Sequence, residues 1–232
     1  MNKAEFDKFA DEYDALQQKN IRLSGESQSF FAEYKIKDIF DLFTNRSDLY
    51  KPQQILDFGA GVGTSIPYFA KFFPDAALTC LDVSEKSLAV GRSRFSGLAS
   101  FQSFDGQSIP YPDNTFDLVF AACVFHHIPH SVHFDLLQEW LRVLKPGGIA
   151  VIFEHNPLNP LTVRAVNTCP FDENAELIGA TQFKKIMLSA GFQGVGLRYR
   201  IFMPGFLRVL RPLERWLRWC PLGAQYFIYA NK

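Results

Sequence analysis

The sequence has no excess of either charge, few cysteines and no long apolar run. Its 232 residues include 24 basic and 24 acidic ones, so no net charge draws the chain towards nucleic acid. The four cysteines form no CxxC pair, which suggests neither a disulfide framework nor a zinc site and favours the cytosol. No apolar stretch reaches the roughly 18 residues of a spanning helix, and the N-terminus lacks the pattern of a signal peptide. We therefore expect a cytoplasmic protein with one main globular domain.

Apolar residues recur at helical spacing through the first 50 residues. They include Phe6, Tyr13 and Leu16, and the pattern resumes after Ser24-Gly25-Glu26 with Phe30, Tyr34, Ile39 and Phe43. The spacing predicts a helical cap over residues 1–50, ahead of a domain that spans 51–232.

From Gln53 onward, short apolar runs alternate with helical stretches. This alternation is typical of βαβ units and predicts an α/β fold with a doubly wound parallel sheet. The runs are QILDF, ALTCLDV, SFQSFD, FDLVFAA and GGIAVIFEH. Helices are expected over 64–73, 84–95, 131–144 and 181–190, with Ser84 as an N-cap and Lys145-Pro146-Gly147-Gly148 as a helix stop. Two last strands are expected over 194–202 and 225–230, with an irregular insert over 156–180 and an amphipathic insert over 204–223.

The strongest signal is a glycine loop between the first run and the first helix. Its residues are Asp57-Phe58-Gly59-Ala60-Gly61-Val62-Gly63. Glycines at this spacing let the chain turn sharply and let a ligand lie on the backbone, while the following helix offers free N–H groups to an anion. The ligand should therefore carry a carboxylate or a phosphate.

The acidic residue of this loop separates two nucleoside ligands. A dinucleotide fingerprint requires GxGxxG, but counting from Gly59 places Thr64 at the last glycine position, and Asp57 would bring negative charge towards a pyrophosphate. S-adenosylmethionine suits the loop better, because its carboxylate can face the helix and its ammonium can face Asp57. A nicotinamide oxidoreductase is the weaker alternative.

Acidic residues also end the next two apolar runs. Leu81-Asp82-Val83 follows the loop by about 20 residues, the distance at which a carboxylate accepts both ribose hydroxyls. Phe104-Asp105-Gly106 ends the third run, where a carboxylate can accept a hydrogen bond from the exocyclic amine of adenine. Either aspartate alone would be more typical of a helix cap or a turn, but the ordered set favours S-adenosylmethionine.

These motifs resemble the class I S-adenosylmethionine-dependent methyltransferases, particularly the group typified by ubiquinone and menaquinone biosynthesis C-methyltransferases. The resemblance covers roughly Phe6 to Phe153 and rests on ILDFGAGVGTS, CLDVSEKSL, FDGQSIPYPDNTFDLVFAACVFHHI and LRVLKPGGIAVI. It implies a Rossmann-like sheet of seven strands in the order 3-2-1-4-5-7-6, with strand 7 antiparallel.

The resemblance also implies roles for single residues. It places Gly59 and Gly61 beneath the methionine part, Asp82 on the ribose, and Asp105 with Gly106 at the adenine. It further implies that Ala122 offers its backbone to the methionine amine, and that Tyr13, within FDKFADEYD, forms part of a lid over the cofactor.

Three histidines follow strand ends near the expected methyl donor: His126, His127 and His155. Histidine titrates near neutral pH and can act as a general base if the acceptor must lose a proton, and we favour His155 for this role. A packing or hydrogen-bonding role stays open for all three. No metal site is expected from His126, His127, His130 and His133, because Pro129 breaks the helix that would align them and Asp135 is the one acidic residue that adjoins them.

The insert near the C-terminus interleaves arginines with large apolar residues. The segment is MPGFLRVLRPLERWLRWCPLG. It can lie on an anionic membrane surface through residues 204–220, cover an apolar substrate entrance, or pack across a sheet edge or a partner. The segment favours an apolar or lipid-linked small molecule as the methyl acceptor.

The sequence thus predicts methyl transfer from S-adenosylmethionine to a small-molecule acceptor. The alternative is a regulatory or assembly protein that binds the cofactor without turnover, since no obligatory catalytic residue stands out. Monomer and homodimer both stay open.

Overall fold

The computed structural model describes residues 26–232, so the predictions for Tyr13 and for FDKFADEYD lie outside the described residues. The strands are β1 (Gln54–Phe58), β2 (Ala77–Asp82), β3 (Ser100–Ser103), β4 (Phe116–Ala122), β5 (Leu144–His155), β6 (Gln193–Arg200) and β7 (Gln225–Asn231). The α-helices are α3 (Gln28–Asn45), α4 (Ile66–Phe72), α5 (Glu85–Arg94), α6 (His133–Val143), α7 (Pro160–Asn167) and α8 (Ala180–Ala190). Short 3-10 helices are η2 (Phe125–His127), η3 (His130–Val132), η4 (Pro170–Asp172) and η5 (Gly205–Trp216).

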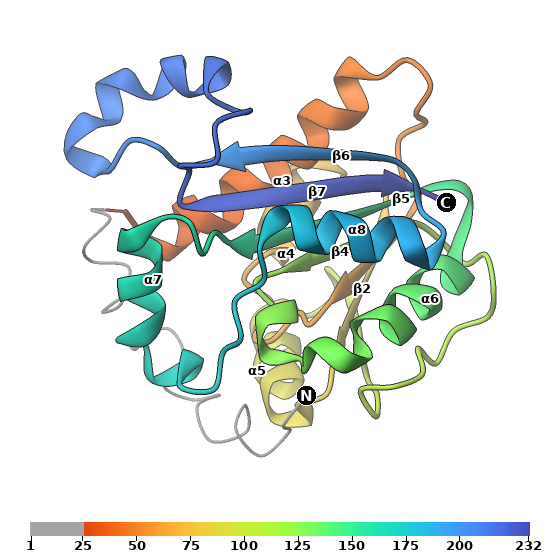
Figure 1. Ribbon diagram of the computed structural model, residues 1–232. Coiled ribbons are helices and arrows are strands. Elements are labelled where there is room, and N and C mark those ends of the chain that lie inside the picture. Colours follow the sequence, from red (N-terminus) through yellow and green to blue (C-terminus); the bar gives the residue numbers. More distant parts are fainter. Residues whose placement is uncertain (1–25) are drawn as a thin grey trace.

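One seven-stranded sheet runs through the molecule in the order β3-β2-β1-β4-β5-β7-β6 (Figure 1). Strands β1 to β5 pair in parallel, whereas β7 is antiparallel to both β5 and β6. The predicted strand order is confirmed. Strand order reverses beside β1, and ligands of open α/β sheets bind outside the carboxyl ends of the strands at such a point.

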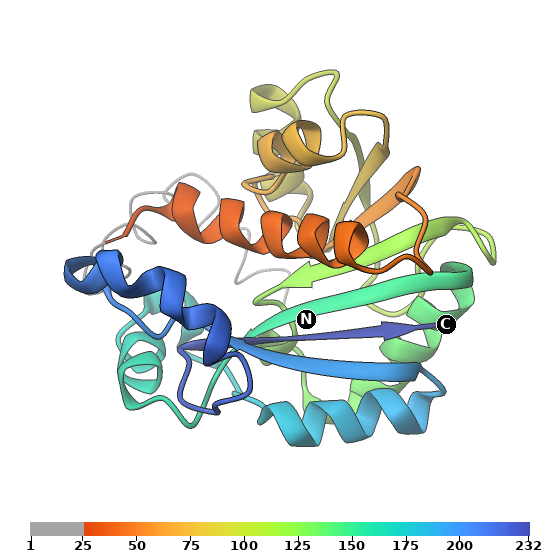
Figure 2. The same cartoon turned by 90° about the horizontal axis from the view of Figure 1, so that it is seen from above.

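Helices cover both faces of the sheet, which explains why its strands are nearly continuous apolar runs. In β4, Leu118 and Phe120 pack with the helices α3, α4 and α5, whereas Val119 and Ala121 pack with α6 and α8. Figure 2 shows α3 and α8 on opposite sides of the strands. The sheet is thus the middle of three layers.

Helix α3 belongs to one of these layers. Ser27 caps its start by accepting a hydrogen bond from the Phe30 N–H, and Ile36 and Ile39 are fully buried in the core. The helix predicted ahead of the sheet is therefore present over 28–45. The lid role assigned to residues 1–50 stays a prediction.

Local signals set several helix ends as expected. Ser84 caps α5 by accepting a hydrogen bond from the Ser87 N–H at 3.1 Å. Gly191 ends α8 in the left-handed conformation, with φ of 109°, which favours glycine over residues that carry a Cβ.

One expectation about local structure is wrong. The insert 156–180 is not irregular throughout, because Asn159 caps α7 with bonds from the Leu161 and Thr162 N–H groups, and Pro160 supplies the fixed φ of a first helical residue. The predicted end of the preceding helix is confirmed, since α6 ends at Val143, and residues 145–148 lie inside β5, where the register against β4 shifts. The amphipathic insert contains the 3-10 helix η5. Within residues 26–232, no helix is long and apolar enough to cross a membrane.

Candidate functional site

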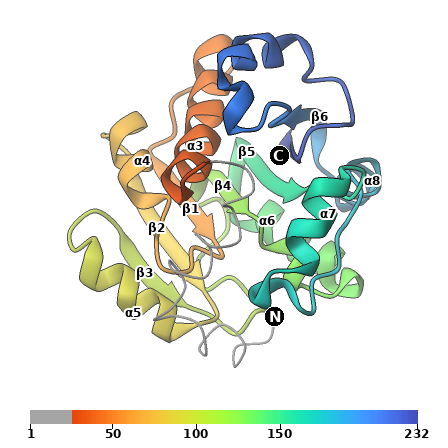
Figure 3. The same ribbon diagram turned by 90° about the vertical axis from the view of Figure 1, so that its left-hand side faces the viewer.

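A cavity of about 460 Å³ opens at the carboxyl ends of the parallel strands. This size is typical of small-ligand sites. Figure 3 looks at this end of the sheet, where α7, η5 and the start of α3 stand around the strand ends. The wall brings together many predicted site residues, namely Gly59, Gly61, Asp82, Ala122, His126, His127 and His155.

Two glycines of the loop shape one side of the cavity. Gly59 has φ of +74°, and a Cβ there would come within 2.5 Å of the Val124 side chain. Gly61 has φ of +54°, and a Cβ there would meet no atom within 4 Å. The open space beside Gly61 is therefore a cradle in which a ligand can approach the backbone closely.

Asp82 lies beside this cradle, at the end of β2. One carboxylate oxygen accepts a hydrogen bond from the Gly61 N–H at 2.8 Å, and the other accepts one from the Ser84 N–H at 2.9 Å. The residue is buried except where it lines the cavity. Its carboxylate is thus fixed in place next to the glycine loop.

Asp57 lies one layer deeper than predicted. It is buried in β1 and accepts a hydrogen bond from the Ser65 hydroxyl, and Ser65 rather than Asp57 contributes to the cavity wall. Burial raises the pKa of Asp57 to about 7. Ser65 therefore lies between Asp57 and the cavity. An ammonium there would meet Asp57 through the Ser65 hydroxyl or after Ser65 had moved away.

Other predicted cofactor residues lie near the cavity without lining it. Among the described residues, this group contains Ala60, Gly63, Val83, Asp105 and Gly106. Asp105 is exposed, and hydrogen bonds from the Gln107 and Ser108 N–H groups lower the pKa of its carboxyl. A Cβ on Gly106 would lie 3.4 Å from Val83, so these two residues adjoin each other just beyond Asp82.

Cys123 is a site residue that sequence reasoning missed. It follows β4 with a positive φ of 58°, an uncommon backbone conformation for a residue other than glycine. Its thiol lies 3.5 Å from the Lys35 Nζ and 3.6 Å from the Gln225 Nε2. Burial alone would raise the pKa of this thiol, but Lys35 and His155 lower it to about 7. Its position directly after the fourth strand was the one available signal.

His155, the predicted general base, is the partner of this thiol. Burial opposes its protonation, but the negative charge of Cys123, a hydrogen bond with its thiol and the charge of Asp172 together raise the pKa of His155. Its Nδ1 lies 3.5 Å from the Gln225 Nε2. Cys123 and His155 therefore form a coupled thiol–imidazole pair at the cavity wall.

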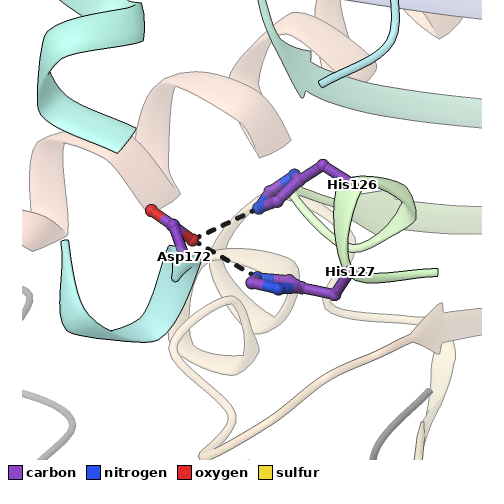
Figure 4. A group of neighbouring side chains, drawn as sticks. All are labelled: His126, His127 and Asp172. Atoms are coloured by element: carbon purple, nitrogen blue, oxygen red, sulfur yellow. Dashed lines mark ion pairs between the residues drawn. The ribbon is translucent and has the colours of Figure 1, made fainter. Parts of the chain in front are cut away.

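His126 and His127 meet carboxylates that the sequence did not place near them. The Nδ1 of His126 donates to Glu154 at 2.6 Å, and the Nε2 atoms of both histidines lie 3.4 Å from one oxygen of Asp172 (Figure 4). Burial disfavours the charged forms of both His126 and Glu154. Their attraction to each other nevertheless raises the pKa of His126 and lowers that of Glu154. The expectation that Asp135 is their acidic neighbour is wrong, since Asp172 reaches them from η4.

The other two histidines of the stretch have structural partners. His133 is buried and its Nε2 lies 3.0 Å from the Phe125 carbonyl and 2.9 Å from the Ile128 carbonyl, while His130 contacts the Glu176 carbonyl. The four histidines therefore do not gather into one cluster.

Mostly apolar side chains form the remaining wall, with Gln28, Thr162 and Arg164 among them. They come from α3, α7 and the chain after β6, and include Phe31, Ala32, Leu161, Ala165, Val166, Phe202 and Pro204. The cavity therefore joins the glycine loop to a largely apolar chamber.

The strand order, the glycine loop and the acidic end of β2 define a class of protein. The profile of the family described as "Methyltransferase domain" matches residues 56–152, which run from β1 to β5. This match shows that residues 56–152 contain a methyltransferase domain, and the strand order is the one expected for a class I S-adenosylmethionine-dependent methyltransferase.

Known proteins agree with this class. A ubiquinone/menaquinone biosynthesis C-methyltransferase of Ectopseudomonas mendocina is 34% identical over 125 residues, covering 51% of this chain and 48% of that protein. The chain thus spans about half the length of the curated relatives it matches. The fold is similar to that of an S-adenosylmethionine-dependent methyltransferase of Thermotoga maritima, with a TM-score of 0.68, 16% identity and 99% of each chain covered. An Archaeoglobus fulgidus methyltransferase has a TM-score of 0.65 and 17% identity, with 89% of this chain and 95% of that one covered.

Proposed function

We propose that the protein transfers a methyl group from S-adenosylmethionine to an apolar small molecule. The observation that carries this proposal is the continuity of one cavity from Gly61 and Asp82 to the apolar chamber formed by α3 and α7. Donor and acceptor can lie in one cavity, as transfer between them requires.

The cofactor residues follow from this placement. Gly59 and Gly61 would lie beneath the methionine part, Asp82 would accept the ribose hydroxyls, and the Ala122 backbone would meet the amine. The neighbouring residues Val83, Asp105 and Gly106 would border the adenine, whereas Asp57, Ala60 and Gly63 would support the loop. When bound, the cofactor supplies an already activated methyl group, so the protein mainly aligns the reactants. Alignment of the reactants can lower the activation free energy by about 7–11 kcal/mol.

The acceptor would be apolar and would lose a proton. The relatives named for ubiquinone and menaquinone biosynthesis support a ring or chain of this kind. The Cys123–His155 pair lines the same cavity and titrates near neutral pH, so it can take up the proton of an acceptor hydroxyl. His126 and His127 would position the acceptor rather than act as the base, since carboxylates already occupy them.

A membrane or a micelle would deliver such an acceptor. Several large apolar side chains of η5 and the following turn are exposed, among them Phe206 at 83% and Trp219 at 77%. Arg208 and Arg215 are exposed beside them, whereas Arg211 and Arg218 pair inward with Glu26 and Asp38. Since Phe202 and Pro204 connect this segment to the cavity wall, we include peripheral lipid contact in the proposal.

Calorimetric titration with S-adenosylhomocysteine, with NADH as a control, tests the cofactor site first. Transfer of labelled methyl from S-adenosylmethionine to a short-chain quinol, compared with a polar amine, then tests the acceptor class. Binding of S-adenosylhomocysteine without transfer to either acceptor would favour the alternative of a cofactor-binding regulatory protein. Binding of NADH alone would contradict the proposal.

A further inference from the structure

We propose that His126, His127 and Asp172 bind a divalent transition metal ion such as Zn²⁺ at the cavity wall. The ion would hold an ionisable oxygen of the methyl acceptor, and this second part rests on the proposed function. The sequence predicted no metal site because it offered the histidines no acidic partner except Asp135. Asp172 of η4 supplies that partner.

The three side chains have the geometry of a ligand set. Asp172 Oδ1 lies 3.4 Å from the Nε2 of each histidine, and the three candidate ligand atoms lie within 4.8 Å of one another. Ligands at about 2.0–2.1 Å from a tetrahedral zinc ion lie about 3.3 Å apart. Figure 4 shows both imidazoles of η2 pointing at the same carboxylate. Two nitrogens and one carboxylate oxygen can therefore take three corners of a tetrahedron with little movement.

A further carboxylate orients one of these ligands. The buried Glu154 accepts a hydrogen bond from the His126 Nδ1 at 2.6 Å, which leaves Nε2 to face Asp172. The other oxygen of Glu154 accepts hydrogen bonds from the Val124 and Phe125 N–H groups, which fixes the carboxylate itself. A carboxylate behind the outer nitrogen of a ligating histidine is the usual support of a zinc site.

The position of the set indicates what the fourth ligand would be. All three residues line the cavity that also contains Gly61 and Asp82, so the remaining corner faces the space assigned to the acceptor. A metal ion lowers the pKa of an oxygen bound to it. Ionisation of an acceptor hydroxyl would break its O–H bond, the oxygen would keep the electron pair, and the proton would leave to solvent.

A simple ion pair between His126 and Asp172 is the competing explanation. In that case a doubly protonated His126 would donate from Nδ1 to Glu154 and from Nε2 to Asp172 without any metal. This pair accounts for the position of His126, whereas the His127 Nε2 approaches the same oxygen as a second nitrogen ligand of one ion would. The two explanations differ in what removal of His127 does to metal binding.

Calorimetry with Zn²⁺ on the full chain, freed of any affinity tag and of bound metal by a chelator, tests the site. We expect one equivalent to bind, and Co²⁺ to give the visible absorption of a tetrahedral complex. His127→Ala and Asp172→Asn should each weaken binding by at least about 100-fold, because loss of a supporting residue alone costs about 10- to 100-fold. Glu154→Gln, which keeps the acceptor for the backbone N–H groups, should fall within that smaller range.

His130→Ala is the matched control, since His130 lies in the same stretch but outside the ligand set and should bind Zn²⁺ normally. Absence of Zn²⁺ binding, or binding that Asp172→Asn and His127→Ala leave unchanged, would overturn the site. Titration of the same samples with S-adenosylhomocysteine separates the two proposals. Normal binding of that ligand with no binding of Zn²⁺ would reject the metal and leave the methyltransferase proposal intact.

Discussion

The carboxylate of Asp82 accepts a hydrogen bond from the backbone N–H of Gly61 at 2.8 Å. This bond ties the end of β2 to the glycine loop before any ligand is present. A carboxylate that is already held in place can accept the ribose hydroxyls without first being ordered, which lowers the entropic cost of binding.

Asp82→Ala should therefore weaken binding of S-adenosylhomocysteine by about 30- to 150-fold, which corresponds to about 2–3 kcal/mol for the loss of two charge-assisted hydrogen bonds. Calorimetric titration measures this change directly. Asp75→Ala, an exposed aspartate after α4, is the control and should leave the affinity unchanged. Equal affinities for Asp82→Ala and the parent protein would show that the ribose lies elsewhere.

Asp57 gives a prediction about the pH dependence of stability. Burial raises its pKa from 3.8 to about 7 in the folded chain. Between these two pH values the folded state binds a proton that the unfolded state has lost. The contribution of Asp57 to the free energy of unfolding is therefore fully present below about pH 4 and is lost as pH rises through 7. Asp57→Asn removes this loss and should be more stable than the parent at about pH 8, by roughly 2–4 kcal/mol.

Urea unfolding of both proteins at about pH 5 and pH 8 measures the difference. The asparagine can still accept from Ser65, so packing is retained. If the stability difference between the two proteins did not grow with pH, Asp57 would be ionised in the fold. The same variant should bind S-adenosylhomocysteine less well, because the neighbouring carboxylate no longer attracts its ammonium.

The Cys123 thiol should react faster with iodoacetamide at neutral pH than an ordinary cysteine does. Its pKa of about 7 means that about half is thiolate at that pH. Lys35→Met removes the ammonium 3.5 Å away and should move the midpoint of the rate–pH curve upward by about one unit or more. Mass spectrometry of the peptide that carries Cys123 follows the reaction, and Cys123→Ser identifies the signal. A midpoint that does not change in Lys35→Met would show that Lys35 does not set the thiol pKa.

Patterns along the chain were sufficient for the parallel strands and for the glycine loop. The alternation of apolar runs and helices predicted the parallel sheet, whereas the strand order and the common site of Gly61 and Asp82 came from the resemblance to the methyltransferases. These features depend on residues close in sequence or on the register of parallel strands. Features of this kind leave a pattern that can be recognised in the sequence.

The other side of the cavity depends on contacts between distant segments. Asp172 reaches His127 from η4, and Lys35 reaches Cys123 from α3, so neither pair has a spacing that a sequence pattern could show. Helix α7 could have been predicted, since Asn159-Pro160 is a strong helix start. The density of prolines in that stretch led us to expect irregular structure instead.

The exposed apolar residues of η5 and the turn after it should bind lipid surfaces. Trp216 is 67% exposed and Trp219 77%, with Arg208 and Arg215 beside them to attract anionic headgroups. We expect the protein to sediment with phosphatidylglycerol vesicles much more than with phosphatidylcholine vesicles, and binding to fall as salt rises. Trp216→Ser with Trp219→Ser should reduce this binding by about tenfold or more, because two large aromatic side chains would no longer enter the interface.

Leu188→Ser, an exposed leucine on α8, is the control for general surface apolarity and should have no effect. Equal vesicle binding by all three proteins would mean that this surface serves some other contact, and the acceptor would then have to reach the cavity from solution.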